Sequence, residues 1–145
     1  MEQTDCVVEY KRDGANGHFW TMTEEGKPIF HMVSADLGPE ARKHWANRML
    51  NAAAMTCVCT TLAADLIKRN ADLRSLTGKA ASIKEKDSVL RTRISEIGVD
   101  VEVDLGDTPQ QVLDECIEIV NRDTLVMYSL REGVDVQANI KRIKK

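Results

Sequence analysis

The chain is organised around the run MLNAAAMTCVCTTLAA, residues 49–64. It carries no formal charge, although 30% of the residues in the chain are charged. An uncharged run rich in alanine, leucine and methionine is typical of a helix that lies where water is scarce. A membrane-spanning helix needs about 20 mostly apolar residues, whereas this run is shorter and is interrupted by Asn51 and by threonines. The stretch therefore predicts a buried central helix, and no membrane is expected as a partner.

Small side chains fill most of this stretch, so another backbone could approach the helix closely. We expect the helix to pack against a second element or a second subunit. Cys57 and Cys59 stand two residues apart and so point to roughly opposite sides of a helix. They are poorly placed to bind one metal ion or to form a mutual disulfide. One of them is expected to face the core and the other a cavity or a partner.

The composition fits a single domain spanning residues 1–145. Twenty basic and 23 acidic residues give a net charge of −3, and neither sign is strongly clustered, which argues against nucleic acid as a partner. The basic tail of Lys141, Arg142, Lys144 and Lys145 is interpreted as a solvated strand end. The N-terminal residues start acidic and contain no apolar segment of signal-peptide length, so a cytoplasmic location is expected. Four cysteines in that compartment are expected to be thiols rather than a disulfide framework.

Turn residues divide the first part of the chain into three predicted strands, at residues 6–12, 18–23 and 29–33. Gly38 and Pro39 then introduce a helix, because proline suits the first helical turn. The helical pattern runs from residue 40 to about residue 69, and a bend or short break before Met49 is left open.

The second part of the chain is predicted to alternate strands and helices. Residues 73–89 are ambiguous, with a strand suggested by alternation at 81–86, whereas period-two alternation from Ile94 to Leu105 predicts a half-buried strand. Thr108, with Gln111 three residues later, predicts a capping box at the start of a helix. That helix is expected to end near residues 121–123 and to be followed by a short helix at 124–131 and a strand at 134–143. The order indicates an α+β fold in which helices cover an antiparallel sheet.

Several catalytic motifs are absent from the sequence. It has no phosphate-binding loop, no dinucleotide fingerprint, no nucleophile elbow and no C-x-x-C pair. His18, His31 and His44 are scattered without a helical pair, so no metal site and no cofactor are expected. From residue chemistry alone, a cysteine in an alanine-rich helix is more often a small core residue than a nucleophile.

The segment AAAMTCVCTTL, from Ala52 to Leu62, resembles the signature helix of the OsmC/Ohr family of thiol-dependent hydroperoxide reductases. In that helix small residues precede a reactive cysteine, and Cys57 falls on the reactive position. Other segments agree in order, namely the Arg-Asp-Gly at residues 12–14, the Gly-Pro at 38–39 and SLREGVDV at 129–136. The resemblance implies an intertwined homodimer in which antiparallel sheets flank two long central helices and the active sites lie at the subunit interface.

The resemblance also assigns roles to individual positions. An arginine from the N-terminal strands orients the thiolate in this family, and Arg12 is the candidate here; a solvated turn residue is the alternative interpretation. An acidic residue near the start of the cysteine helix steadies that arginine, but Asn47 stands at its position. The second cysteine of the family falls on Thr124. An amide cannot neutralise a cation, and a threonine cannot resolve a sulfenic acid into a disulfide.

Two functions therefore remain open. The first is a divergent thiol peroxidase, cytoplasmic and antioxidant, that reduces organic hydroperoxides through Cys57 and is itself reduced by an external thiol. Cys116 or Cys59 could resolve the sulfenic acid after rearrangement, although core packing is favoured for Cys116, and Cys6 is expected to be incidental. The second is a non-catalytic OsmC-like protein that binds an apolar small molecule or carries a thiol at the dimer interface.

Overall fold

The computed structural model describes residues 7–13, 17–24, 27–33 and 36–144, so Cys6 and the turn residues 14–16 lie outside the described part of the chain. The chain divides into two compact units, Met1–Trp45 and Ala46–Lys145. That both units form one domain over residues 1–145 stays a prediction.

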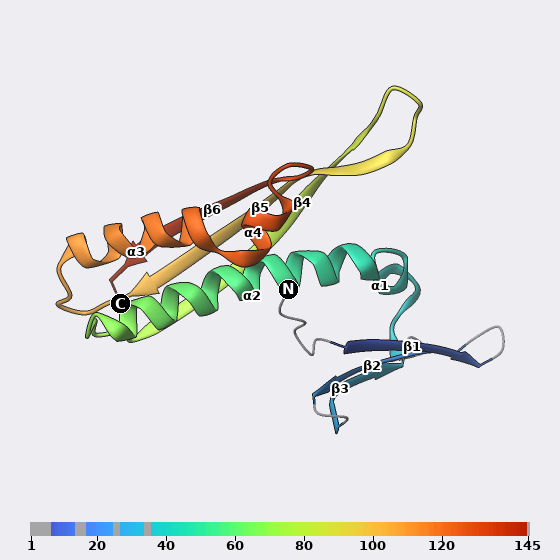
Figure 1. Ribbon diagram of the computed structural model, residues 1–145, viewed down its shortest axis with the longest axis horizontal. Coiled ribbons are helices and arrows are strands. Elements are labelled where there is room, and N and C mark those ends of the chain that lie inside the picture. The colour runs from blue at the N-terminus through green and yellow to red at the C-terminus, as the bar shows by residue number, and fades with distance from the viewer. Residues whose placement is uncertain (1–6, 14–16, 25–26, 34–35, 145) are drawn as a thin grey trace, which may run out of the picture. The chain divides into compact units, whose positions relative to one another are not determined.

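The first unit contains an antiparallel sheet with the strand order β1-β2-β3 (Figure 1). Its strands are β1 (Val7–Asp13), β2 (Gly17–Glu24) and β3 (Lys27–Val33), in agreement with the three predicted strands. The short helix α1 (Pro39–Lys43) follows, with Gly38 as its N-cap and proline in its first turn. This helix ends at His44, so the predicted long helix is interrupted before Met49.

The helix α2 (Trp45–Lys68) contains the uncharged run. Its buried residues follow one another at four-residue intervals and so form one stripe along the helix: Ala54, Val58, Leu62 and Leu66. The helix ends in a Schellman motif, in which Asn70 adopts a φ of 57° and the Ala71 amide donates to the Leu66 carbonyl. This hydrogen bond satisfies a carbonyl group that the last helical turn would otherwise leave unpaired.

The second sheet has the order β4-β5-β6. Strands β4 (Ser75–Lys86) and β5 (Thr92–Asp104) form an antiparallel hairpin, whereas β6 (Asp135–Ile143) runs parallel to β5. The expectation of a wholly antiparallel sheet is therefore wrong for its last strand. The reason is the connection: two helices carry the chain back from the end of β5 to the start of β6, and such a crossover joins parallel neighbours.

Those two helices are α3 (Gln110–Asp123) and α4 (Leu125–Leu130). The predicted capping box at the start of α3 is not formed, because Pro109 is the N-cap and no side chain caps the helix. The Thr108 hydroxyl instead accepts a hydrogen bond of 2.8 Å from the Asp72 amide. The Thr108 hydroxyl thus makes a tertiary contact with the loop after α2, and it does not cap α3 as the local pattern predicts.

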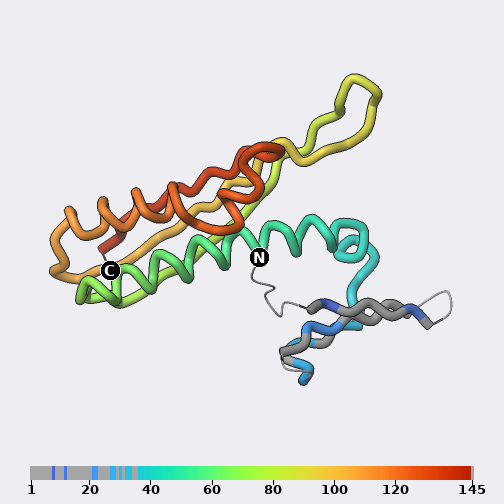
Figure 2. The backbone as a smooth tube through the Cα atoms, viewed as in Figure 1, coloured from blue at the N-terminus to red at the C-terminus, as the bar shows by residue number. Residues whose placement is uncertain are grey.

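The core of the second unit lies on one face of its sheet. Along β5 the buried residues alternate, with Ile97, Val99, Val101 and Val103 at most 1% exposed, while Asp100 and Glu102 between them are exposed. The buried stripe of α2 and the buried residues of α3 belong to the same hydrophobic cluster, so both helices cover this one face (Figure 2). The result is a two-layer α+β arrangement, which confirms the predicted fold class.

Candidate functional site

Cys57 lies at the edge of the core. Its neighbours Ala54 and Val58 are fully buried, whereas Cys57 itself is half-buried and is not among the residues that pack against the core cluster. Its backbone carbonyl accepts a hydrogen bond of 3.4 Å from the Thr60 hydroxyl, which also donates to the Thr56 carbonyl. Cys57 thus lies beside the buried stripe of α2 but outside it.

Cys59 faces the second sheet. A Cβ atom added at Gly78 of β4 would lie 2.7 Å from the Cys59 sulfur and 3.2 Å from Cγ of Met55. Glycine at this position thus lets the strand approach the helix closely. Burial raises the pKa of the Cys59 thiol, so less of it is thiolate at a given pH. This placement meets the expectation that one of the two neighbouring cysteines faces the core.

Cys116 is part of the core. It is 0% exposed on α3 and belongs to the hydrophobic cluster. Burial is the main cause that raises the pKa of its thiol; Asp65 and Glu115 raise the pKa further, while Arg69 opposes them. The observed burial agrees with the core packing favoured for this residue. To resolve a sulfenic acid, Cys116 would first have to leave the core.

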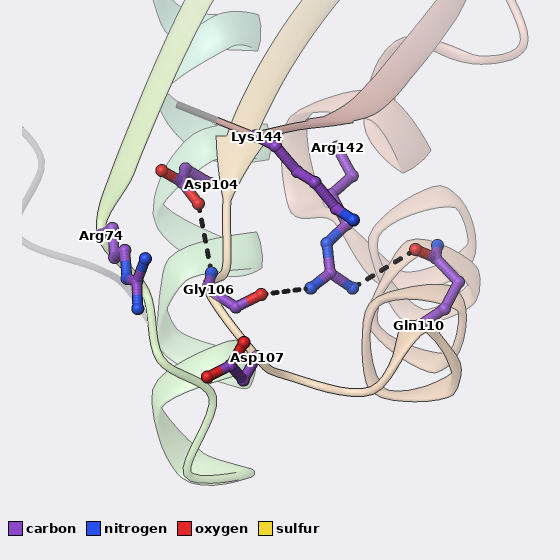
Figure 3. A pocket seen from close by; sticks show the side chains of 7 residues that line it. All are labelled: Arg74, Asp104, Gly106, Asp107, Gln110, Arg142 and Lys144. Atoms are coloured by element: carbon purple, nitrogen blue, oxygen red, sulfur yellow. Dashed lines mark hydrogen bonds between the residues drawn. The ribbon is translucent and has the colours of Figure 1, made fainter.

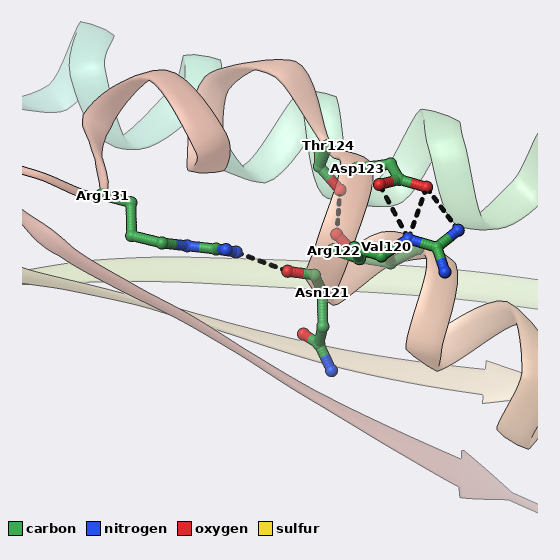
Figure 4. A network of polar contacts seen from close by, with 6 residues as sticks. All are labelled: Val120, Asn121, Arg122, Asp123, Thr124 and Arg131. Carbon is green, nitrogen blue, oxygen red and sulfur yellow. Dashed lines mark hydrogen bonds and ion pairs between the residues drawn. The ribbon is translucent and has the colours of Figure 1, made fainter.

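Thr124, at the position of the family's second cysteine, is 1% exposed and lies where α3 passes into α4 (Figure 4). Its hydroxyl donates to the Val120 carbonyl, and its own carbonyl accepts a hydrogen bond of 2.9 Å from the Tyr128 amide. Arg131 also stabilises this junction, because its guanidinium donates a hydrogen bond of 2.5 Å to the Asn121 carbonyl. The buried Thr124 hydroxyl therefore has a hydrogen-bond partner within the core, and the residue joins the two helices.

Asn47, at the position of the family's acidic residue, makes a structural contact. Its Oδ1 atom accepts a hydrogen bond of 2.9 Å from the Ser82 hydroxyl on β4. The same hydroxyl accepts a hydrogen bond of 3.4 Å from the Asn51 amide. These half-buried contacts connect the first turns of α2 to β4. Because residue 47 is an asparagine, this position carries no negative charge.

Arg12 is an exposed residue of β1, where it is paired in register with His18. It belongs to the unit Met1–Trp45, whereas Cys57 belongs to the unit Ala46–Lys145. The pairing of this arginine with the thiolate stays a prediction. Within the described residues, no group of three or more His, Cys, Asp or Glu side chains is placed to hold a metal ion.

One charged cluster was missed by the sequence analysis. Arg142, expected to be part of a solvated strand end, is half-buried, and its guanidinium donates to the Gly106 carbonyl at 2.8 Å. Lys144 and Arg74 line a cavity together with Arg142. No local pattern could reveal this cluster, because Arg74 is far from the other two residues in the sequence.

The environments of the three thiols in the described residues predict an order of alkylation. With iodoacetamide at neutral pH, Cys57 is expected to react before Cys59 and Cys116, because burial and a raised pKa slow the reaction of those two thiols. Raising the pH towards 9 should accelerate the reaction of Cys59 more than that of Cys116, whose thiol is fully covered. Peptide mass spectrometry over time measures all three rates, and early labelling of Cys116 would contradict this picture.

Comparison with known families identifies the class of protein to which this fold and the cysteine helix belong. The sequence model of the OsmC-like protein family matches residues 46–139, from the start of α2 into β6. This match covers well over half of the chain. The chain therefore belongs to the OsmC-like family. No curated protein shows significant sequence similarity to it.

Solved structures share the fold at low sequence identity. An OsmC-like protein from Mycoplasma pneumoniae is 11% identical, with a TM-score of 0.72, and the match covers 99% of this chain and 100% of that one. An OsmC-like protein of unknown function from Vibrio cholerae is 17% identical, with a TM-score of 0.68, and the match covers 97% and 99% of the two chains. The organic hydroperoxide resistance protein OhrB of Bacillus subtilis is 17% identical, with a TM-score of 0.59 and coverage of 94% and 97%.

Proposed function

We propose that this OsmC-like protein is a thiol-dependent peroxidase that reduces organic hydroperoxides at Cys57. The observation that carries the proposal is the position of this thiol, which is half-buried on α2 and follows Met55 and Thr56 beside the buried residue Val58. Of the other thiols in the described residues, Cys59 packs against β4 and Cys116 is fully buried. The name of the Bacillus subtilis relative, an organic hydroperoxide resistance protein, supports the same substrate class.

The proposed reaction has two stages. The Cys57 thiolate attacks the terminal oxygen of the hydroperoxide; an S–O bond forms, the O–O bond breaks, and the alkoxide leaves as an alcohol after taking up a proton. The resulting sulfenic acid then reacts with one external thiol to give a mixed disulfide and water. A second external thiol attacks that disulfide, which regenerates Cys57 and releases the oxidised reductant.

Arg12 is proposed to orient the thiolate, on the basis of the family resemblance. A cation beside Cys57 would stabilise the thiolate that attacks the peroxide. Asn47 cannot anchor that cation by charge, since its amide is neutral and bonded to Ser82. This departure favours the second candidate function, in which the family's interface site binds an apolar small molecule without turnover.

Peroxide consumption separates the two functions. The wild-type protein with dithiothreitol is expected to consume cumene hydroperoxide faster than hydrogen peroxide, because α2 carries no charge from residue 49 to residue 64 around Cys57 and an apolar surface favours an apolar substituent. Loss of peroxide, followed by a colorimetric assay, gives both rates. Rates no higher than those of dithiothreitol alone would contradict the peroxidase and leave the binding function in its place.

We also propose that a second copy of the chain covers α2. Between residues 49 and 64 the exposed positions of this helix carry no charge; they are Ala52, Ala53, Thr56, Thr60 and Ala64. By length and composition α2 could cross a membrane, and only 22% of its most apolar window is buried in the chain itself. One such helix is weak evidence for a span. An uncharged helix face of this kind instead suits a partner helix in a homodimer, the assembly that the family resemblance implies.

A charge placed on this face should break the proposed dimer. Ala53→Glu is expected to give a monomer at micromolar concentration in sedimentation velocity, because the new carboxylate would be buried without a partner. Asn121→Glu, an equal change of charge on the exposed side of α3, should leave the dimer intact. A wild-type protein that sediments as a compact monomer would contradict both the dimer and the proposed placement of the site at an interface.

A further inference from the structure

A second candidate site lies at the edge of the sheet where β5 and β6 end. A cavity of about 500 Å³ opens there, lined by Arg74, Asp104, Gly106, Asp107, Gln110, Arg142 and Lys144 (Figure 3). Every one of these residues belongs to the unit Ala46–Lys145. None of the three cysteines in the described residues lines the cavity, so its chemistry is independent of the proposed peroxidase.

The chain topology explains why charged groups meet at this edge. Strands β5 and β6 are parallel, so their carboxyl ends lie together, and α3 starts a few residues after β5. In α/β units, ligands commonly bind in the crevice beyond the carboxyl ends of parallel strands, beside the start of the helix that follows. The cavity occupies this place in the β5-α3-α4-β6 unit.

Three cations from two segments of the chain line the cavity. Arg142 lies near the end of β6 and donates to the Gly106 carbonyl at 2.8 Å and to the Gln110 side chain at 3.4 Å. Lys144 follows β6, and Arg74 precedes β4. Arg74 also pairs at 2.9 Å with Asp72, a neighbour that does not line the cavity.

Two carboxylates share the lining. Asp104 is 6% exposed, and one of its oxygens accepts a hydrogen bond of 3.1 Å from the Gly106 amide. Asp107 is exposed. Three cations against two carboxylates leave the lining with a formal charge of +1, and Asp72 pairs with Arg74 from outside the lining. Asp104 is buried and accepts from the loop backbone, whereas Lys144 is exposed, so this cation is better placed than that acid to meet a ligand.

The loop between β5 and α3 depends on glycine at position 106. Gly106 adopts a φ of +50°, and a Cβ atom there would lie 2.1 Å from Oδ2 of Asp72 and 2.7 Å from the Arg74 guanidinium. Glycine therefore allows the backbone to pass close to this arginine. A larger side chain there would have to move the side chains of Asp72 and Arg74, which form an ion pair.

The first turn of α3 adds amide donors to the same edge. No side chain caps this helix, because Thr108 accepts from the Asp72 amide instead. The first amides of a helix have no acceptor within the helix, and its dipole makes this end partly positive. Gln110, the first residue of α3, lines the cavity.

We propose that this cavity binds the oxyanion group of a small molecule, either a phosphate or a carboxylate, between Arg142, Lys144 and Arg74. Charge-assisted hydrogen bonds from arginine and lysine are the interactions that recognise such groups. Arg142 is held by two hydrogen bonds to the loop and helix, so part of the site is preorganised. Lys144 supplies an exposed cation.

An NMR titration with inorganic phosphate tests the proposal. At constant ionic strength, the amide signals of Gly106, Gln110 and Gln111 are expected to shift and to saturate at millimolar phosphate. Lys144→Gln should weaken this binding about threefold to tenfold, because one charged hydrogen bond is lost. Lys141→Gln is the matched control, since Lys141 is an exposed lysine on β6 that does not line the cavity.

The outcomes separate the possible ligands. Saturation with phosphate but not with malonate would assign the site to phosphate groups, and the reverse would assign it to carboxylates. Shifts that fail to saturate with either anion would overturn the proposal. An equal loss of affinity in Lys144→Gln and Lys141→Gln would also overturn it, since that result indicates a general charge effect.

Discussion

Replacing Cys57 with serine is expected to lower the rate of hydroperoxide consumption by roughly 100-fold or more, since a serine hydroxyl is a far weaker nucleophile than a thiolate. The assay follows the loss of cumene hydroperoxide in the presence of dithiothreitol. Serine is close to cysteine in size, and Cys57 lies beside the buried stripe rather than within it, so folding should be preserved. Circular dichroism and a melting curve verify that point.

Cys59→Ala is the matched control for this experiment. It removes a thiol from the same helix, but one that packs against Gly78 of β4, and its rate is expected to stay within about threefold of wild type. If Cys57→Ser keeps the wild-type rate, Cys57 is not the nucleophile. If Cys59→Ala loses as much activity as Cys57→Ser, the assignment of roles to the two thiols is wrong.

Replacing Thr124 with cysteine is expected to change the oxidised product from a sulfenic acid to an internal disulfide with Cys57. The substitution puts a thiol at the position of the family's second cysteine. It removes the hydrogen bond from the Thr124 hydroxyl to the Val120 carbonyl, which should cost about 1 kcal/mol of stability. The disulfide requires that the two Cα atoms come within roughly 7 Å of each other.

Intact mass and thiol counting after one equivalent of cumene hydroperoxide measure this change. In the Thr124→Cys protein two thiols should be lost together, with a mass decrease of about two hydrogens. Ser129→Cys adds a thiol at an exposed position on α4 and should form no internal disulfide. A Thr124→Cys protein that retains both thiols, or that accumulates the same sulfenic acid as wild type, would contradict the proposed geometry.

The elements that the sequence predicts well are those in which local pattern and burial agree. The uncharged run becomes the centre of α2, and the alternation from Ile94 to Leu105 becomes β5, because one face of each element packs on the core. The orientation of the last strand differs from the predicted antiparallel sheet, because β6 runs parallel to β5. Whether β6 pairs parallel or antiparallel depends on the crossover through α3 and α4, which no local pattern encodes.

Contacts between distant residues explain the other differences. Thr108 has the local context of a helix cap, yet the Asp72 amide takes its hydroxyl. Asn47 has no distinct local pattern, and its bond to Ser82 follows only from the packing of α2 on β4. Cys57 was singled out through family resemblance, since residue chemistry alone favoured a core role. Its half-buried position is compatible with the family role.

In the proposed mechanism Cys57 reacts with hydroperoxide, and no second cysteine at position 124 resolves the product. Mass spectrometry of the wild-type protein, treated with one equivalent of cumene hydroperoxide and trapped with dimedone, distinguishes this mechanism from its alternatives. We predict a dimedone adduct on Cys57 and, with excess peroxide, sulfinic acid at the same residue. A rapid disulfide between Cys57 and Cys116 would contradict the one-cysteine mechanism, and an unmodified Cys57 would contradict the peroxidase itself.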